Sequence, residues 1–368
     1  MALVSGTAAA DEKLMIGVHG YHQQWLTYVQ EDNDNAAVGT AKRTGIDVKS
    51  NSEIWFTGSK KLDNGITVGV DVQLESDQPA GGGQIDETYA WFSSDSLGKI
   101  IIGDENNAAY LLHVWPTNGG VSVASGDVIN IAAFRKPAGV ASYYNTALGT
   151  TNIRAGENDT SKLTYLTPKF FGFQAGVSWW PEGAGQTANA SGSRITTMHD
   201  GFAIGANYSN NFNGIGLGIS AGYLTMDSTG GPQGPFGATG RDSRLDQYNV
   251  GLMVSFAGFT VTGNYNAIDD GMMTSTTTFD STSWSLAASY ATGPYTVGIQ
   301  YFSGEAEDSI LVAADDEHDV LMISGGYQLG AGVRLVAGFY TFDDTDETNL
   351  AATSNDGWGL VLGTKISF

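Results

Sequence analysis

The sequence contains no cysteine, so no disulfide framework holds the fold and no thiol chemistry is available. Basic residues are scarce: 17 Lys and Arg stand against 39 Asp and Glu, a formal net charge of −22. Nucleic acid is therefore excluded as a partner, because a phosphate backbone requires a basic binding surface. Long hydrophobic runs are missing too, since no stretch approaches the roughly 18 apolar residues of a membrane helix. This absence excludes helical membrane spans and nothing more.

Glycine and aromatic residues are plentiful. The 368 residues include 50 Gly, aromatic residues make up 11% of the chain, and hydrophobic residues only 41%. A soluble chain of this length would normally form two or three domains. Glycine and aromatics combined with apolar alternation, and without long apolar runs, are typical instead of a membrane barrel with a wet interior.

The last twelve residues largely alternate between apolar and small or polar side chains. Period two is the repeat of a strand with two different faces. One face is mostly large and apolar and ends on the terminal aromatic residue: Trp358, Leu360, Leu362, Ile366 and Phe368. The other face carries Gly359, Gly363, Lys365 and Ser367 among others. Such a pattern is typical of a strand between lipid and water.

The preceding chain repeats this pattern. Its clearest strand places Ile66, Val68, Val70, Val72 and Leu74 on one face and Thr67, Gly69, Asp71, Gln73 and Glu75 on the other. An acidic face predicts a water-filled interior, because buried unpaired carboxylates are costly. Connections alternate between tight turns and long polar loops, over about sixteen strands. We therefore predict an all-β fold: a transmembrane antiparallel β-barrel with short periplasmic turns and long external loops.

Three internal segments and the terminal Phe368 resemble the sixteen-stranded general porins of the Gram-negative outer membrane. The segments are Asn64–Gly69, Gly98–Asp104 and Pro168–Val177. The resemblance implies that the third external loop, within residues 104–159, folds into the barrel and narrows it. It also implies a homotrimer packed through the first and last strands, in contact with outer-membrane lipid and lipopolysaccharide. In that family the terminal pattern, here Trp358 to Phe368, is the signal read by the assembly machinery.

Residues 1–10 lack a basic start and a full apolar core, but Ala8-Ala9-Ala10 resembles a cleavage site. We interpret them as the remnant of a signal peptide or a cloning scar, and residues 11–368 as a single barrel.

The chemistry of a pore is the field and width of its constriction, and here the sequence departs from the family pattern. His113 and Thr117 stand where the inserted loop often carries acids, and Glu53, Tyr89 and Leu166 stand where the wall often carries arginines. The predicted pore-lining residues are Lys49, Glu53, Asp71, Tyr89, His113, Trp115, Thr117, Asp127, Arg135, Lys136 and Lys162. Because acids outnumber bases, we predict a channel for ions and small hydrophilic solutes with a mild cation preference.

Three alternatives remain open. Trp55, Tyr89, Trp91 and Trp115 could form a stacking track in a porin specific for a sugar, phosphate or an organic acid. A barrel enzyme would need a nucleophile such as a Ser-His pair, but the five histidines lie in no such motif. A structural barrel would anchor envelope layers without conducting. We expect no enzyme activity and no cofactor.

Two acidic segments, at 305–319 and 343–347, read as exposed loops. They could bind Ca²⁺ loosely or bridge divalent ions to lipopolysaccharide, but they lack the spacing of a dedicated calcium loop. No dedicated metal site is expected.

Overall fold

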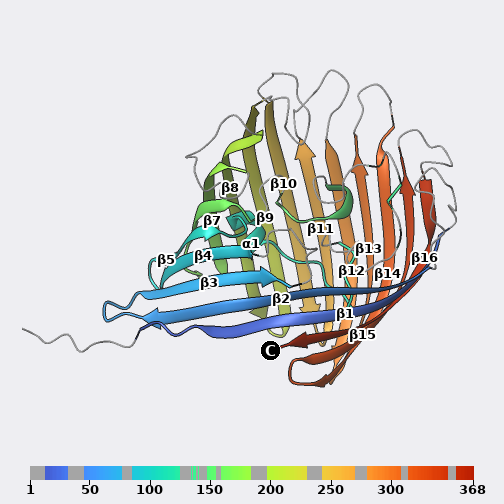
Figure 1. Cartoon of the computed structure of the whole chain (residues 1–368), viewed down its shortest axis with the longest axis horizontal. Helices are drawn as coiled ribbons and strands as arrows, with labels where there is room; N and C mark the ends of the chain where they lie inside the picture. Colours follow the sequence, from blue (N-terminus) through green and yellow to red (C-terminus); the bar gives the residue numbers. More distant parts are fainter. Residues whose placement is uncertain are drawn as a thin grey trace, which may run out of the picture.

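The strands form one closed antiparallel barrel in which each strand pairs with its neighbours in sequence and β1 pairs with β16 (Figure 1). The structure, a computed structural model, describes residues 13–31, 45–76, 85–124, 134, 136–137, 140, 147–154, 159–183, 197–229, 243–269, 280–307, 314–346 and 354–368. The predictions for residues 1–10 fall outside these ranges. The strands are β1 Gly17–Glu31, β2 Ile46–Lys61, β3 Thr67–Glu75, β4 Ile85–Ser94, β5 Gly98–Asp104, β6 Ser161–Leu166, β7 Phe173–Glu182, β8 Thr197–Phe212, β9 Ile215–Thr229, β10 Ser243–Phe256, β11 Phe259–Asp269, β12 Ser281–Thr292, β13 Tyr295–Ala306, β14 Asp316–Gly330, β15 Val333–Thr345 and β16 Ser354–Ser367.

The barrel closes at the chain's own end. β1 and β16 pair from Tyr21↔Ser367 to Glu31↔Gly357, and beyond them Gly20 and Phe368 exchange two backbone hydrogen bonds of 3.0 and 3.1 Å. A Cβ built on Gly20 would lie 2.3 Å from the carbonyl oxygen of Glu53 and 3.1 Å from the Phe368 ring. Only glycine therefore lets the terminal ring pack against β1 at the seam.

Tight turns and long connections lie at opposite ends of the barrel, as predicted. Asn213-Gly214 joins β8 to β9 with φ of 53° and 91°, and Ala257-Gly258 joins β10 to β11 with φ of 49° and 88°. Positive φ at both central residues matches the right-handed twist of the strands that these turns connect. In Figure 1, β1 to β3 cross the strands of the far wall at a steep angle, as steeply tilted barrel strands must.

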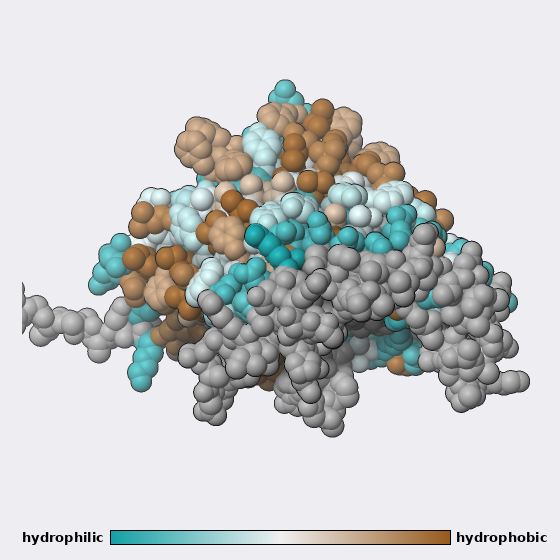
Figure 2. All heavy atoms as spheres, turned by 90° about the horizontal axis from the view of Figure 1, so that it is seen from above, coloured by the Kyte–Doolittle hydropathy of each residue, from teal (hydrophilic) through white to brown (hydrophobic). Residues whose placement is uncertain are grey.

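The two faces of the wall differ as the alternation predicts. On β10, Tyr248, Val250 and Leu252 are exposed outward, whereas Gln247 and Asn249 are buried inside. In Figure 2, hydrophobic side chains form brown groups on the surface shown, and a band of hydrophilic ones borders the grey segments. An apolar outer band and a polar inner face suit a wall between lipid and water.

Helices are minor elements. α1, Ala108–Leu112, and the 3₁₀ turn η2, Ala147–Gly149, lie inside the barrel. None of the described helices is long and apolar enough to cross a membrane.

The expectation that both acidic segments are exposed loops holds for Asp315, which is exposed and precedes β14, but it is wrong for the acids that lie on strands. Asp316 and Asp319 lie on β14, and Asp343 and Asp344 on β15. Asp316 and Asp344 are fully buried, and His318 Nδ1 lies 2.6 Å from Asp344 Oδ1. The strand alternation simply continues past the apolar band, so alternate acids turn inward. Asp308 and Glu347 lie outside the described residues.

Candidate functional site: the constriction of the barrel

The connection between β5 and β6 folds into the barrel. Its helix α1 begins where the Asn107 side chain accepts hydrogen bonds from the backbone N–H groups of Ala109 and Tyr110, which satisfies two amides at the helix start. The helix lies against the inner faces of β7, β8 and β9. Glycines on the wall allow this approach: a Cβ on Gly205 would lie 2.5 Å from the Cα of Ala109.

After α1, the backbone of the loop is held by polar side chains of the wall, strand after strand. Successive backbone amides bond to hydroxyl or amide oxygens: Val114 N to Ser220 Oγ at 2.8 Å on β9, Thr117 N to Thr262 Oγ1 at 2.9 Å on β11, Val123 N to Gln300 Oε1 at 2.7 Å on β13, and Gly119 N to Ser324 Oγ at 3.1 Å on β14. Arg334 on β15 donates to the carbonyl oxygen of Gly119 at 2.9 Å. The inner polar face therefore positions the loop.

The closest approach between loop and wall is at Gly119. A Cβ there would lie 2.0 Å from the backbone oxygen of Ser324 and 2.6 Å from the backbone nitrogen of Gly298. A Cβ on Gly298 would in turn lie 2.6 Å from the nitrogen of Gly119. Two facing glycines thus bring the loop backbone directly against the strands.

The returning half of the loop is held in the same way. Backbone carbonyl oxygens accept from wall side chains: Thr150 O from Ser283 Oγ at 2.7 Å, Thr151 O from Asn249 Nδ2 at 2.5 Å, and Asn152 O from Gln247 Nε2 at 2.8 Å. The inward-folded third loop, predicted from resemblance, is confirmed. Within the described residues most of its anchors lie on β7 to β15, and the start of the loop is also held by Glu87 on β4, which accepts a hydrogen bond from Asn106 Nδ2 at 2.8 Å.

The loop surface is aromatic and uncharged. Residues 106–124 contain no Asp, Glu, Lys or Arg. The ring of Trp115, 45% exposed, lies 4.1 Å from that of His113 and 5.2 Å from that of Tyr110, measured between centroids. His113 is buried behind it, with Nδ1 2.7 Å from the carbonyl oxygen of Tyr110. Burial lowers the pKa of His113 to about 4, so the ring is neutral at pH 7.

The facing wall is acidic. Glu53 on β2 accepts hydrogen bonds from Tyr21 Oη at 2.6 Å and from Trp55 Nε1 at 2.7 Å. Asp71 on β3 accepts from Trp91 Nε1 at 2.7 Å. Aromatic donors therefore hold these carboxylates in place and leave their charge facing the half-buried inner surface.

A second acidic group lies beside Glu53. One carboxylate oxygen from each of Glu53, Glu75 and Asp86 lies within 4.8 Å of the others, and the same holds for Asp86, Glu87 and Asp159. At the start of the loop, burial raises the pKa of Glu105, while the Tyr89 hydroxyl and Lys162 act in the opposite direction.

Two of the basic side chains near this wall are buried or face a ring. Lys162 is 4% exposed and donates to the carbonyl oxygen of Glu105. Lys99 lies 4.8 Å from the centroid of the Trp91 ring.

The structure assembles part of the predicted set. Lys49, Glu53, Asp71 and Tyr89 share the inner face of β2 to β4 by register. Thr117 faces the wall instead of the lumen: its Oγ1 lies 2.6 Å from Ser289 Oγ. Lys136 donates to the carbonyl oxygens of Pro137 and Val140. Asp127 and Arg135 lie outside the described residues.

Sequence reasoning missed Asp86, Glu87 and Glu105. Glu87 lies two residues before Tyr89 on the same strand, so strand alternation could have predicted that it faces the lumen. Asp86 could not, because the register shifts between Gln73 and Leu74, where Leu74 pairs with Ile85, and the bulge brings Asp86 among the inner carboxylates.

A closed barrel of sixteen tilted strands, narrowed from within by a loop, has the architecture of a porin-type channel. A family model described as Gram-negative porin matches residues 1–348, so the chain belongs to the Gram-negative porin family. It is therefore an outer-membrane channel protein.

Solved structures share the fold at low sequence identity. An anion-selective porin from Comamonas acidovorans is 16% identical with a TM-score of 0.62, and OmpT of Vibrio cholerae in its trimer form is 11% identical with a TM-score of 0.60; each comparison covers 97% of this chain and 100% of the other. A mutant of the Rh. blastica porin is 19% identical with a TM-score of 0.54, over 96% and 100%. No curated protein matches by sequence.

Proposed function

We propose that the channel passes ions and small hydrophilic solutes with a preference for cations. The observation that carries this proposal is the asymmetry of the constriction: an uncharged loop segment, 106–124, faces a wall that bears Glu53, Asp71, Glu75 and Asp86. Rings of carboxylates attract cations and repel anions in a pore. The low-dielectric wall strengthens this effect, since screening by water is weaker there.

The experiment is single-channel recording of the purified protein in a planar bilayer, under a KCl gradient. We expect a reversal potential whose sign shows that K⁺ permeates more readily than Cl⁻. Its magnitude should fall as ionic strength rises. A reversal potential of the chloride sign would overturn the proposal. The Comamonas acidovorans porin is described as anion-selective, but at 16% identity its likeness shows the fold alone, so this chain's own lumen decides.

A second candidate is a solute track specific for a sugar, phosphate or organic acid. The exposed Trp115 ring on the loop favours a sugar, because a flat ring can stack on a pyranose face. Trp55 and Trp91 support it less, because their indole N–H groups are already bonded to Glu53 and Asp71. Saturable block of the ion current by a sugar would distinguish this track from a general pore.

We also propose that the protein assembles as a homotrimer through the outer faces of β1 and β16. His22 on β1 faces outward, with Nδ1 2.6 Å from Ser52 Oγ on β2, and Gln24 donates to the carbonyl oxygen of Lys49 at 2.8 Å. Polar groups on a lipid-facing surface are costly, and a subunit contact would remove them from lipid. OmpT of Vibrio cholerae is described in a trimer form. Mass measurement in detergent tests this, and a monomer under native conditions would refute it.

The surroundings of the barrel follow from its location. We propose contact with outer-membrane lipid and lipopolysaccharide, and loose Ca²⁺ binding at the acidic strand ends, where Glu305 pairs with Glu317 and Asp319 with Asp343. Like charges opposite one another are destabilising, and a divalent ion bridging to lipid phosphate would relieve this. Heat stability that is the same with Ca²⁺ and with a chelator would exclude it.

A further inference from the structure

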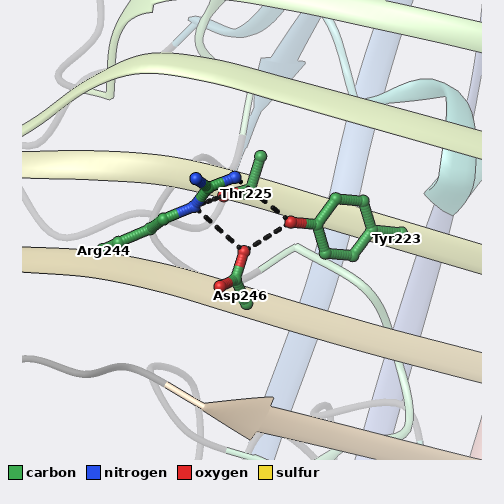
Figure 3. A network of polar contacts seen from close by, with 4 residues as sticks. All are labelled: Tyr223, Thr225, Arg244 and Asp246. Carbon is green, nitrogen blue, oxygen red and sulfur yellow. Dashed lines mark hydrogen bonds and ion pairs between the residues drawn. The ribbon is translucent and has the colours of Figure 1, made fainter.

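A polar network lies on the outer face of β9 and β10, near the end that carries the long loops. Arg244 Nε donates to Thr225 Oγ1 at 2.8 Å and lies 3.3 Å from Asp246 Oδ1, which also accepts from Tyr223 Oη at 2.5 Å (Figure 3). The neighbouring Leu245 is buried inside the barrel. Strand alternation therefore places Arg244 and Asp246 on the outside.

The network turns Arg244 away from its direct cross-strand partner. In the register of β9 and β10, Arg244 stands opposite Asp227, and Asp246 opposite Thr225. Opposite charges so placed normally pair, yet Arg244 bonds to Thr225, Asp246 and Tyr223 instead. Within the part of the chain that the structure describes, the Asp227 carboxylate forms no hydrogen bond or ion pair with another side chain.

On its other side, Asp227 meets a histidine. His199 on β8 stands opposite Asp227 in register, and a register shift between His199 and Phe202 brings Asp200 to the same place. His199 Nδ1 lies 3.1 Å from Asp200 Oδ2, and one ligand atom from each of His199, Asp200 and Asp227 lies within 4.8 Å of the other two. The imidazole is 10% exposed and the Asp200 side chain 38%.

We propose that His199, Asp200 and Asp227 bind a first-row divalent metal ion of the zinc class on the outer rim of the barrel. One imidazole nitrogen and two carboxylate oxygens form a ligand set that such ions accept. Ligand atoms on a tetrahedral ion at about 2.1 Å lie roughly 3.4 Å apart. Closing the three atoms onto one ion therefore requires only small rotations of two aspartates at the surface. The buried histidine fixes the position, and the fourth ligand position is open to water or a lipid headgroup oxygen.

The probe is Co²⁺, whose visible absorption reports tetrahedral coordination, followed by competition with Zn²⁺. The sample is the untagged full-length protein in detergent, because a histidine tag would bind both ions. Stoichiometric binding is expected, and His199→Gln and Asp227→Asn should each weaken it by at least about tenfold, since even outer-shell changes cost 10–100-fold.

A matched control tests position. Asp343→Asn removes an outward acid at the same rim, on β15. It should bind Co²⁺ like the parent protein. Unchanged conductance and circular dichroism of all three variants show that folding is intact.

Arg244 offers a sharper test. Asp246→Asn releases Arg244 to pair with Asp227, so metal affinity should fall although no ligand has changed. Adding Arg244→Gln to that variant should restore the affinity. Co²⁺ binding that is indifferent to His199→Gln, or absent from the parent protein, would overturn the proposal, as would an octahedral spectrum shared by all variants.

Discussion

The two sides of the constriction are built in different ways. The wall at β2 to β4 presents carboxylates whose positions are set by strand register and by aromatic donors such as Tyr21 and Trp91. The loop segment 106–124 carries no charged residue, and its backbone amides donate hydrogen bonds to wall side chains such as Ser220 and Gln300. We therefore propose that the wall sets the electric field of the pore and that the loop sets its width. Each can be changed without the other.

The largest change is expected from neutralising the wall. Glu53→Gln, Asp71→Asn, Glu75→Gln and Asp86→Asn combined should abolish cation preference, with the reversal potential in a KCl gradient moving close to zero. The loop segment 106–124 has no charge to replace the lost field. The matched control removes outward acids, as Glu305→Gln, Glu317→Gln and Asp343→Asn, and should leave selectivity unchanged. If wall and control variants shift the reversal potential equally, the lumen carboxylates do not set selectivity.

Width should change when the loop loses its closest contact. Gly119→Val places side-chain atoms into the Ser324 backbone, so the segment must lift from β14. Losing the bonds to Ser324 and Arg334 costs about 2 kcal/mol at about 1 each. Altered unitary conductance and noisier open states are expected, with unchanged strand content by circular dichroism. The control is Gly263→Ala on β11, where a Cβ meets nothing within 4 Å. Conductance identical to the parent would show that the loop does not set the width.

Acid should loosen the loop through His113. Its pKa falls from 6.5 to about 4 on burial, so the buried ring disfavours the proton. The loop is fully stable above pH 6.5 and is progressively destabilised as pH falls through 4. Current fluctuations should increase over that window and should do so less in His113→Gln. The wall carboxylates are the same in both proteins, so the difference between the two pH profiles isolates the imidazole. Identical pH profiles would contradict its role.

The smallest effect is expected from Trp115→Ala. The ring is half-exposed on the loop surface, and its removal takes no charge and no anchor. Selectivity between K⁺ and Cl⁻ should stay the same while conductance rises slightly. If the parent shows saturable sugar block, this variant should lose it, and Phe171→Ala, at an exposed turn outside the lumen, should retain it. Block that survives in Trp115→Ala would remove the aromatic track.

Much of the fold was predictable because a barrel wall between lipid and water forces period-two alternation on every strand. The outward direction of Leu360 and Leu362 and the inward direction of Asp71 follow from strand alternation alone. The strand ends were less predictable: β14 and β15 continue past the apolar band, so Asp316 and Asp344 are buried where composition indicated exposed loops.

The sequence by itself determined the approximate strand count, the direction in which wall residues face wherever the alternation is unbroken, and the segregation of short turns from long loops, because these depend only on neighbours along the chain. Tertiary structure decided the rest. The inserted loop meets Ser220, Gln300 and Ser324, which lie 106 to 205 residues away in sequence. The pairing of His199 with Asp227 likewise needs a register shift that no local pattern announces. Contacts between distant segments depend on how the whole barrel closes, and local alternation does not encode that.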